Sequence, residues 1–264
     1  MVSETTKKLT DAIMKCIRPL TYPVAVKVVT YDDDSPRPER AKTVTELLGH
    51  SVAFCQGFGL VRRFGYTLVF DEACHACPPG LVYTGYYPPD VIHEGNNAVP
   101  GYAIDKAAGA AMEAPNALIP LGKVKEFWLS PLEKAKFDPD IVVVYGNPAQ
   151  IARMIHANNY STGEGIANLA FGRAACSGYI SAVYNTQKCN YVVPSGGERI
   201  FALTQDDEMI FSIPSTQFEK ITEGLENTHK AGLVRYPTPY QGMKAEPGFP
   251  PYYWNIVPEE RRKK

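Results

Sequence analysis

The sequence predicts a single-domain, mixed α/β protein. Short runs rich in β-branched residues, such as Pro23–Val29 and Asp140–Gly146, have the length and composition of strands. Other segments, such as residues 3–18, repeat apolar side chains at helical spacing. The chain has 264 residues, of which 45% are hydrophobic and 21% are charged. That balance is ordinary for a globular protein and the length allows a sizeable core, so we expect one domain over residues 1–264.

The first part of the chain predicts alternating helices and strands. In residues 3–18 we expect a helix that Ser3 caps and Pro19 ends. Pro23–Val29 follows as a strand. The further elements expected are a weak helix at Thr43–Leu48, a helix at 56–64, a strand at Tyr66–Phe70, an irregular stretch at 81–100, a helix at Ala103–Glu113 and a strand at Val124–Leu129.

The second part opens on Asp140–Gly146, the clearest buried strand of the chain. Asn147 and Pro148 then open a helix through His156, because Asn is a favoured cap and Pro fits the first turn. The remaining elements expected are a glycine-rich loop at Gly163–Gly172, a helix at 177–185, a strand at Tyr191–Val193, a turn at Ser195–Gly197, a strand at Met209–Ile213, a helix at Thr216–Lys230 and an extended Pro- and aromatic-rich tail over 236–264.

The two halves of the chain, about 20–120 and 121–235, share an order of features. In each, a strand is followed by a Cys-x-Gly triplet, a helix, a second strand and a glycine-bearing turn; the triplets begin at Cys55 and Cys176. The pattern indicates an internal duplication, with chance similarity as the alternative. Two-fold related halves would bring both cysteines to equivalent places near helix starts, where the helix dipole favours thiolate.

Composition excludes several classes of function. The net charge of −1 offers no electrostatic attraction for nucleic acid or an anionic membrane. No apolar stretch approaches the roughly 20 residues that span a bilayer. The N-terminal segment interleaves charged and apolar residues, unlike a signal peptide. We therefore expect a cytoplasmic protein whose six cysteines are thiols.

Cys74 and Cys77 have a chelating spacing, which suits a metal, an iron–sulfur cluster or a redox dithiol. The pair is not a haem attachment, because Pro78 follows Cys77 where a histidine would be needed. A second Cys-x-x-Cys of a zinc ribbon is missing. A thioredoxin-type helix is disfavoured, because Pro78 and Pro79 make the entry into a helix awkward.

Soft thiolates are the ligands of iron–sulfur clusters, so the first functional hypothesis is a redox or metal-binding protein with a cluster, or another thiolate-bound metal, at the junction of the halves. Cys16 lies on the apolar side of the first helix and is expected to pack in the core. The predicted ligands are Cys55, Cys77, Cys176 and one of Cys74 or Cys189.

Two alternatives stay open. Cys176 or Cys55 would be the nucleophile of an enzyme acting on a small molecule, with His75 or His93 as a base within reach. Otherwise the thiols are buried structural groups in a module that binds a ligand or a partner. The partner would be a small molecule or a redox protein, and the aromatic tail suits either a homodimer contact or a segment folded on its own domain.

Several short blocks together carry a family resemblance. They are Pro23–Lys27, Cys55-Gln56, Cys77–Gly80, Pro139–Val143, Gly146–Gln150, Cys176, Gly197–Arg199 and Thr204–Met209. In these blocks the chain resembles the uncharacterised ArCR family, a domain-of-unknown-function family of archaea and bacteria, many of them anaerobes. The resemblance covers nearly the whole chain and implies a fold without an activity. Members often carry a cysteine where this chain has Ser195, which implies that a four-thiolate site here would need Cys74 or Cys189.

Overall fold

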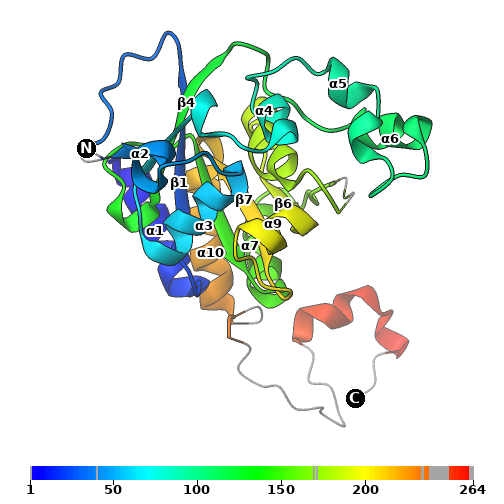
Figure 1. Ribbon diagram of the computed structural model, residues 1–264. Coiled ribbons are helices and arrows are strands. Elements are labelled where there is room, and N and C mark those ends of the chain that lie inside the picture. The colour runs from blue at the N-terminus through cyan, green and yellow to red at the C-terminus, as the bar shows by residue number, and fades with distance from the viewer. Residues whose placement is uncertain are drawn as a thin grey trace.

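The computed structural model describes residues 2–39, 41–168, 170, 172–232, 235–237 and 250–261. Within them a seven-stranded sheet has the order β2-β3-β4-β1-β5-β7-β6 (Figure 1). The β2–β3 pair is parallel and the other neighbours are antiparallel. The strands are β1 (Val24–Thr30), β2 (Lys42–Thr43), β3 (Leu68–Asp71), β4 (Val124–Pro131), β5 (Ile141–Gly146), β6 (Asn190–Val192) and β7 (Met209–Pro214). The mixed α/β prediction is confirmed.

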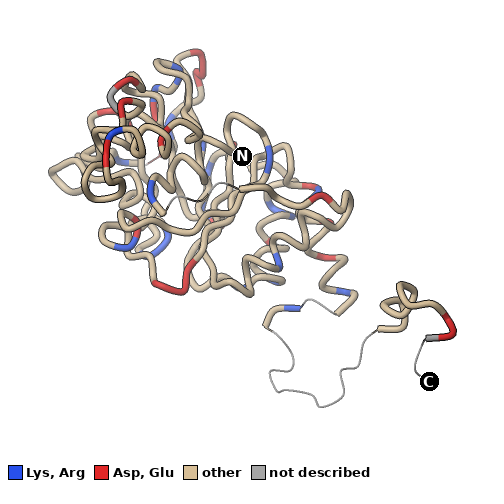
Figure 2. The backbone as a smooth tube through the Cα atoms, turned by 90° about the vertical axis from the view of Figure 1, so that its right-hand side faces the viewer, with Lys and Arg blue, Asp and Glu red and all other residues tan. Residues whose placement is uncertain are grey.

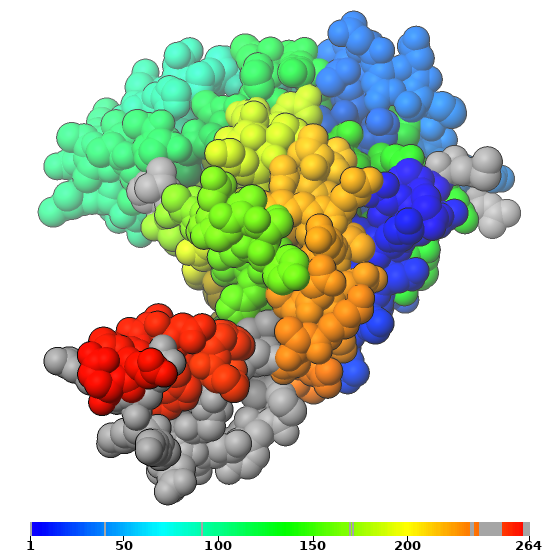
Figure 3. All heavy atoms as spheres, turned by 180° about the vertical axis from the view of Figure 1, so that it is seen from behind, coloured from blue at the N-terminus to red at the C-terminus, as the bar shows by residue number. Residues whose placement is uncertain are grey.

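Helices cover both faces of the sheet. The front layer contains α2 (Val44–Leu48), α3 (Phe54–Phe64), α4 (Pro78–Tyr83), the π-helical turn η4 (Ser177–Ser181), α8 (Ala182–Thr186) and α9 (Gly196–Phe201). The back layer contains α1 (Glu4–Cys16), α7 (Pro148–Asn159) and α10 (Phe218–Ala231), which lie side by side in Figure 3. The other helical elements are η1 (Glu72–Cys74), α5 (Asp90–His93), η2 (Asn96–Ala98), α6 (Lys106–Glu113), η3 (Leu132–Lys134), η5 (Ser215–Gln217), η6 (Pro251–Ile256) and η7 (Glu259–Arg261).

Strand alternation divides the core into two clusters. On β1, Val24, Val26 and Val28 face the front cluster with α3 and η4, while Ala25 and Val29 face the back cluster with α1, α7 and α10. This alternation is the expected consequence of the two-residue period of a strand. The positions of charged residues are scattered along the backbone in Figure 2. None of the described helices is long and apolar enough to cross a membrane.

The pairing of β1 with β5 is symmetric. These first strands of the two halves run antiparallel with Val24 opposite Val143, Ala25 opposite Val142 and Val26 opposite Ile141. In the first half, β4 lies between β1 and β3 and pairs with both. In the second half, β7 lies between β5 and β6 in the same way.

The symmetry extends to the hydrogen bonds that follow these strands. Both β4 and β7 end in a proline opposite the first residue of the paired strand. The next residue of each, Leu132 or Ser215, donates its N–H over 2.8 Å to the carbonyl of Pro23 or Asp140, respectively. This pattern supports the prediction of two similar halves. It moves the boundary from residue 120 to beyond β4, because β4 pairs within the first half.

Helix starts follow the expected capping rules, with two exceptions. Ser3 caps α1, and Asn147 caps α7 with Pro148 in the first turn, as the sequence predicts. The inference that Pro78 hinders a helix is wrong: α4 begins at Pro78, because a first turn needs neither that N–H nor a free φ. The expected turn at Ser195–Gly197 is instead the start of α9.

Two irregular segments also differ from expectation. The stretch 81–100 contains the end of α4, all of α5 and the turn η2. In the tail, residues 251–256 form the 3-10 turn η6, and residues 238–249 and 262–264 lie outside the described part.

A buried ion pair links α3 to the loop between α9 and β7. The Arg62 guanidinium bonds both carboxylate oxygens of Glu208, at 2.8 and 3.0 Å, and donates to the Leu203 carbonyl at 2.9 Å. It also stacks 4.1 Å above the ring centre of Tyr145 on β5. Arg62 is 1% exposed, so its charge depends on Glu208 for compensation.

Replacing Glu208 with alanine is therefore expected to lower the free energy of unfolding by about 3–5 kcal/mol, because it leaves a buried guanidinium without its counter-charge. Urea denaturation measures the loss. The matched control is Asp206→Ala, since Asp206 faces Arg199 from a fully exposed position and its removal is expected to leave stability unchanged. Equal stability of the two variants would contradict the role given to the Arg62–Glu208 pair.

Candidate functional site

Three cysteines lie at helix starts on the front of the sheet. Cys55 is in the first turn of α3, Cys77 caps α4 and Cys176 precedes η4. Backbone pairing holds the first two together: Val52 donates to the Cys74 carbonyl over 2.9 Å and accepts from the Ala76 N–H over 2.8 Å. The loop that carries Cys77 is thereby fastened beside the segment that leads into α3.

Two serine hydroxyls fasten the third cysteine segment. Ser181 donates to the carbonyl of Tyr83 on α4 over 2.8 Å, and Ser177 donates to the Ala117 carbonyl over 2.7 Å. The helical segment after Cys176 therefore packs against the helix that Cys77 begins. Cys176 is more than 90 residues from Cys55 and Cys77 in the sequence, and only the fold brings it to them.

A carboxyl group completes the cluster. Glu198, 3% exposed on α9, accepts a 3.0 Å hydrogen bond from the Ser195 N–H and another from the Ser195 hydroxyl. Helix α9 can approach α3 closely because Gly59 has no side chain: a Cβ there would lie 2.9 Å from the Ala202 carbonyl oxygen. Ala202 in turn packs in one small cluster with Cys55 and Cys77.

The three thiols and Glu198 share one electrostatic environment. Burial raises the pKa of Cys55, and the charges of Glu198 and Cys77 raise it further. Burial likewise raises the pKa of Cys176, and the charges of Glu198, Cys77 and Cys55 raise it further. The pKa of Cys77 is raised by burial and by Glu198, while the Gly80 N–H and Arg173 oppose the shift. At neutral pH all three cysteines are therefore protonated.

The other cysteines are not part of this cluster. The Cys74 N–H bonds the Asp71 carboxylate at 3.1 Å, which turns the thiol into the front core toward the Val69 carbonyl. Cys189 and Cys16 pack in the back cluster. Cys16 is thus a packing residue, as predicted. The choice of Cys74 or Cys189 as a fourth ligand stays a prediction; the polar groups coupled to the three thiols are Glu198 and, through it, Ser195.

The sequence did not single out Glu198. Its signal is the series Ser195-Gly196-Gly197-Glu198, a capping-box pattern that predicts a helix start and a carboxylate folded back on it. Tyr145 and Tyr179 were also missed. Both hydroxyls are buried without a hydrogen-bond partner among the described residues. Burial is the main cause that raises the pKa of both phenols, and the charge of Glu198 raises it further. No local pattern marks them, since each reads as a core aromatic.

Within the described residues, no three histidine, cysteine, aspartate or glutamate side chains stand ready as metal ligands. The donors of the cluster are nevertheless those that soft metals prefer, and they come from separate, well-anchored segments. All six cysteines are free thiols. The arrangement is a protonated thiol site that needs side-chain rotation and proton loss before it can bind a metal.

The geometry disfavours the cysteine-nucleophile alternative. His75 stacks on Phe54, with ring centres 5.4 Å apart, and meets Phe70 and Tyr86 edge-on. Burial lowers its pKa to about 3, and neither ring nitrogen has a partner. His93 lies exposed on α5. No hydrogen bond joins a described histidine to a thiol, although His75 Nδ1 and Cys77 Sγ each lie 3.6 Å from the point where a Cβ of Gly80 would stand.

A separate cavity of about 500 Å³ lies behind Cys176. Its walls include the glycine-rich loop, the edge strand β6 and residues of α10, and Cys189 lines it. Ala175 and Ser177, the neighbours of Cys176, line the cavity, but none of the three clustered thiols does. The cavity is therefore distinct from the thiol site.

The fold and site define a class: a mixed α/β protein with three thiols and a carboxyl gathered on one face of its sheet. The chain belongs to the uncharacterised ArCR family, whose model matches residues 12–224. It is 26% identical over 236 residues to an uncharacterised protein of the archaeon Methanocaldococcus jannaschii, covering 86% of this chain and 94% of that protein. No solved structure matches the chain.

Protonated thiols predict slow alkylation. Because only thiolate reacts, iodoacetamide is expected to modify Cys55, Cys77 and Cys176 slowly at pH 7, with rates that keep rising about tenfold per pH unit up to pH 9. Peptide mass spectrometry follows each cysteine separately. Fast modification of one cysteine that levels off below pH 8 would restore the nucleophile hypothesis.

His75 predicts a loss of stability in acid. Its pKa of about 3 in the folded state lies below the ordinary 6.5, so the unfolded chain binds the proton more tightly as pH falls below 6.5. At pH 5 the loss is about 2 kcal/mol relative to pH 7. His75→Phe is expected to fold and to lack this loss, whereas the exposed control His50→Gln keeps it. Chemical denaturation at both pH values measures the difference.

Proposed function

We propose that this protein binds a thiolate-held metal, most specifically an iron–sulfur cluster, through Cys55, Cys77 and Cys176. One observation carries the proposal: the three cysteines at helix starts lie on the front of the sheet and are electrostatically coupled to one another and to Glu198, while Cys16 and Cys189 pack behind the sheet and the Cys74 thiol points to the Val69 carbonyl. Buried cysteines with only packing roles have no reason to converge in this way.

The chemistry of the donors supports a soft metal or cluster. Thiolates suit iron–sulfur clusters, zinc and cuprous copper better than hard cations. The surroundings are partly closed to water: Cys55 is 9% exposed, and Cys77 and Cys176 are half-buried. The absence of disulfides among the six cysteines supports a reducing compartment, and we place the protein in the cytoplasm.

Binding would be coupled to proton release. Each thiol is held neutral by burial and by its neighbours, so each must lose a proton before its sulfur becomes a ligand. The positive charge of the metal offsets the repulsion among thiolates and Glu198 that keeps them protonated. The affinity for metal should therefore increase with pH, and the site would exchange electrons with a redox partner or act on a small molecule.

Iron and acid-labile sulfide are expected in matching amounts in protein purified without oxygen, together with broad visible absorption. Changing Cys55, Cys77 or Cys176 singly to serine is expected to remove most of the iron. Cys189→Ser is the matched control, since it alters an equally buried thiol on the back of the sheet and should retain the iron.

Two results would contradict the proposal. Colourless protein without iron, zinc or copper under these conditions would exclude a resident metal. Equal loss of iron in Cys189→Ser and Cys55→Ser would show a general effect on folding in place of ligand loss. Circular dichroism of each variant separates the second case, because a folded variant keeps its helical signal.

A further inference from the structure

The cavity of about 500 Å³ lies at the β6 edge of the sheet. Its lining comes from elements that are far apart in the sequence: the end of α7, the turn η4, α8, β6 and the start of α10. The volume is within the range of small-molecule binding sites, ~300–1,000 Å³. None of the three thiols proposed as ligands lines the cavity, so a role for it goes beyond the proposed function.

Hydrogen bonds hold the lining in place. Asn190 on β6 donates to the Gly178 carbonyl of η4 over 2.9 Å, and Ser177 of η4 donates to the Ala117 carbonyl over 2.7 Å. Strand β6 is in turn paired with β7, with Asn190 opposite Ser212. A site that is formed before its ligand arrives loses little conformational freedom on binding. The cavity has this preformed character.

Two lysines give the cavity an excess of positive charge. Lys188 and Lys220 line it, the first exposed and the second half-buried. Among the described residues, no ion pair joins either ammonium to a carboxylate. Lys220 contacts the amide oxygen of Asn158, 3.5 Å away, and that group carries no charge. Glu164, the acidic residue of the lining, is exposed.

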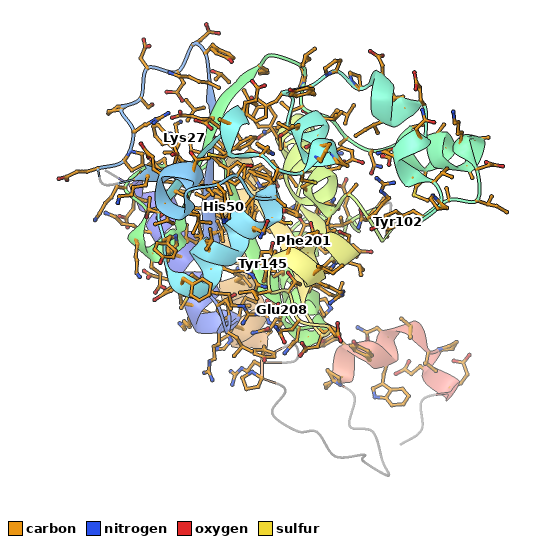
Figure 4. All side chains as sticks on the ribbon, in the orientation of Figure 1. Lys27, His50, Tyr102, Tyr145, Phe201 and Glu208 are labelled. Atoms are coloured by element: carbon orange, nitrogen blue, oxygen red, sulfur yellow. The ribbon has the colours of Figure 1, made fainter. Side chains whose placement is uncertain are left out.

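Arg173 also lines the cavity, but its charge is already compensated. Its guanidinium forms a 3.0 Å ion pair with the fully buried carboxylate of Glu113. It also lies 4.7 Å from the ring centre of Tyr102, which is labelled in Figure 4. Lys188 and Lys220 are therefore the cations of the described lining that lack a counter-charge. An anion within a few ångströms of them would be attracted more strongly here than in open water.

We infer that this cavity binds a small organic anion, a carboxylate or a phosphate ester, whose charged group contacts Lys188 and Lys220. Both kinds of anion accept charge-assisted hydrogen bonds from ammonium groups. The side-chain amides of Asn116 and Asn190 belong to the same lining and are suited to bonding the remaining polar atoms of the ligand. The volume is many times the roughly 30 Å³ of a water molecule, so it accommodates an organic body beside the charged group.

Isothermal titration calorimetry of the full chain with citrate and with glycerol 3-phosphate tests the inference, and glycerol is the uncharged probe. We expect at least one of the two anions to bind and glycerol not to bind. Lys188→Met and Lys220→Met remove the charge and keep the length of the side chain. Each is expected to weaken binding about tenfold or more, the effect of one lost charge-assisted hydrogen bond. Lys230→Met, in the last turn of α10, is the matched control and should bind like the natural chain.

Cys189 provides a local readout, because it lines the cavity whereas Cys16 does not. Both cysteines pack in the back cluster. Alkylation at pH 9 with and without the anion, followed by peptide mass spectrometry, gives a rate for each. We expect the bound anion to slow the modification of Cys189 more than that of Cys16. Equal slowing of both would show a general stabilisation of the fold and would overturn the placement of the ligand in the cavity.

Three further results would overturn the inference. Neither anion binding would exclude an anion site, and glycerol binding as tightly as glycerol 3-phosphate would exclude recognition of the charge. Unchanged affinity in both lysine variants, with helical signals by circular dichroism equal to that of the natural chain, would exclude these lysines as contacts. Binding of citrate alone or of glycerol 3-phosphate alone would support the inference and identify the anion as a carboxylate or a phosphate. These measurements do not depend on iron, so they leave the proposed function to its own test.

Discussion

The antiparallel contact between β1 and β5 is the constraint on which the rest of the structure depends. It pairs Ala25 with Val142 at its centre, with β4, β3 and β2 extending outward beside β1, and β7 and β6 beside β5. Both strands are buried on both faces, so a one-residue shift of register would move apolar side chains between the front and back clusters. The position of every helix on the front face follows from this register.

The segments that follow β1 and those that follow β5 both supply helices to the front face of the sheet. Chain segments around residues 55, 77, 176 and 195 come together, although none is close to all the others in sequence. The ion pair between Arg62 and Glu208 fastens the outer side of this group, where α3 passes α9. The positions of the site residues are thus set mainly by the pairing of the strands, and only a few side-chain bonds contribute.

Burial has two opposing effects at this site. It excludes water, which favours soft-metal and redox chemistry, and it raises the pKa of the thiols, which disfavours the anions that such chemistry requires. Glu198 strengthens the second effect in the metal-free protein. A bound cation would reverse the balance, since it stabilises thiolate and carboxylate together. The same groups that make the thiols unreactive therefore suit them to a metal.

The sequence by itself determined the mixed α/β class and the places of α1, β1, β5 and α7. Those elements depend on local signals: caps such as Ser3 and Asn147, and continuous β-branched runs. The repeated Cys-x-Gly triplet also singled out Cys55 and Cys176, and the Cys-x-x-Cys spacing singled out Cys77; their role as ligands stays a prediction.

Only the tertiary structure decided which cysteines meet. Cys74 is three residues from Cys77, yet the turn capped by Asp71 directs its thiol into the core. Cys189 precedes a strand, and the pairing of that strand places it behind the sheet. The fold also brings Glu198, with its hydrogen-bond partner Ser195, to the thiols. A local sequence pattern does not contain the register between distant strands, and that register sets the face to which each side chain points.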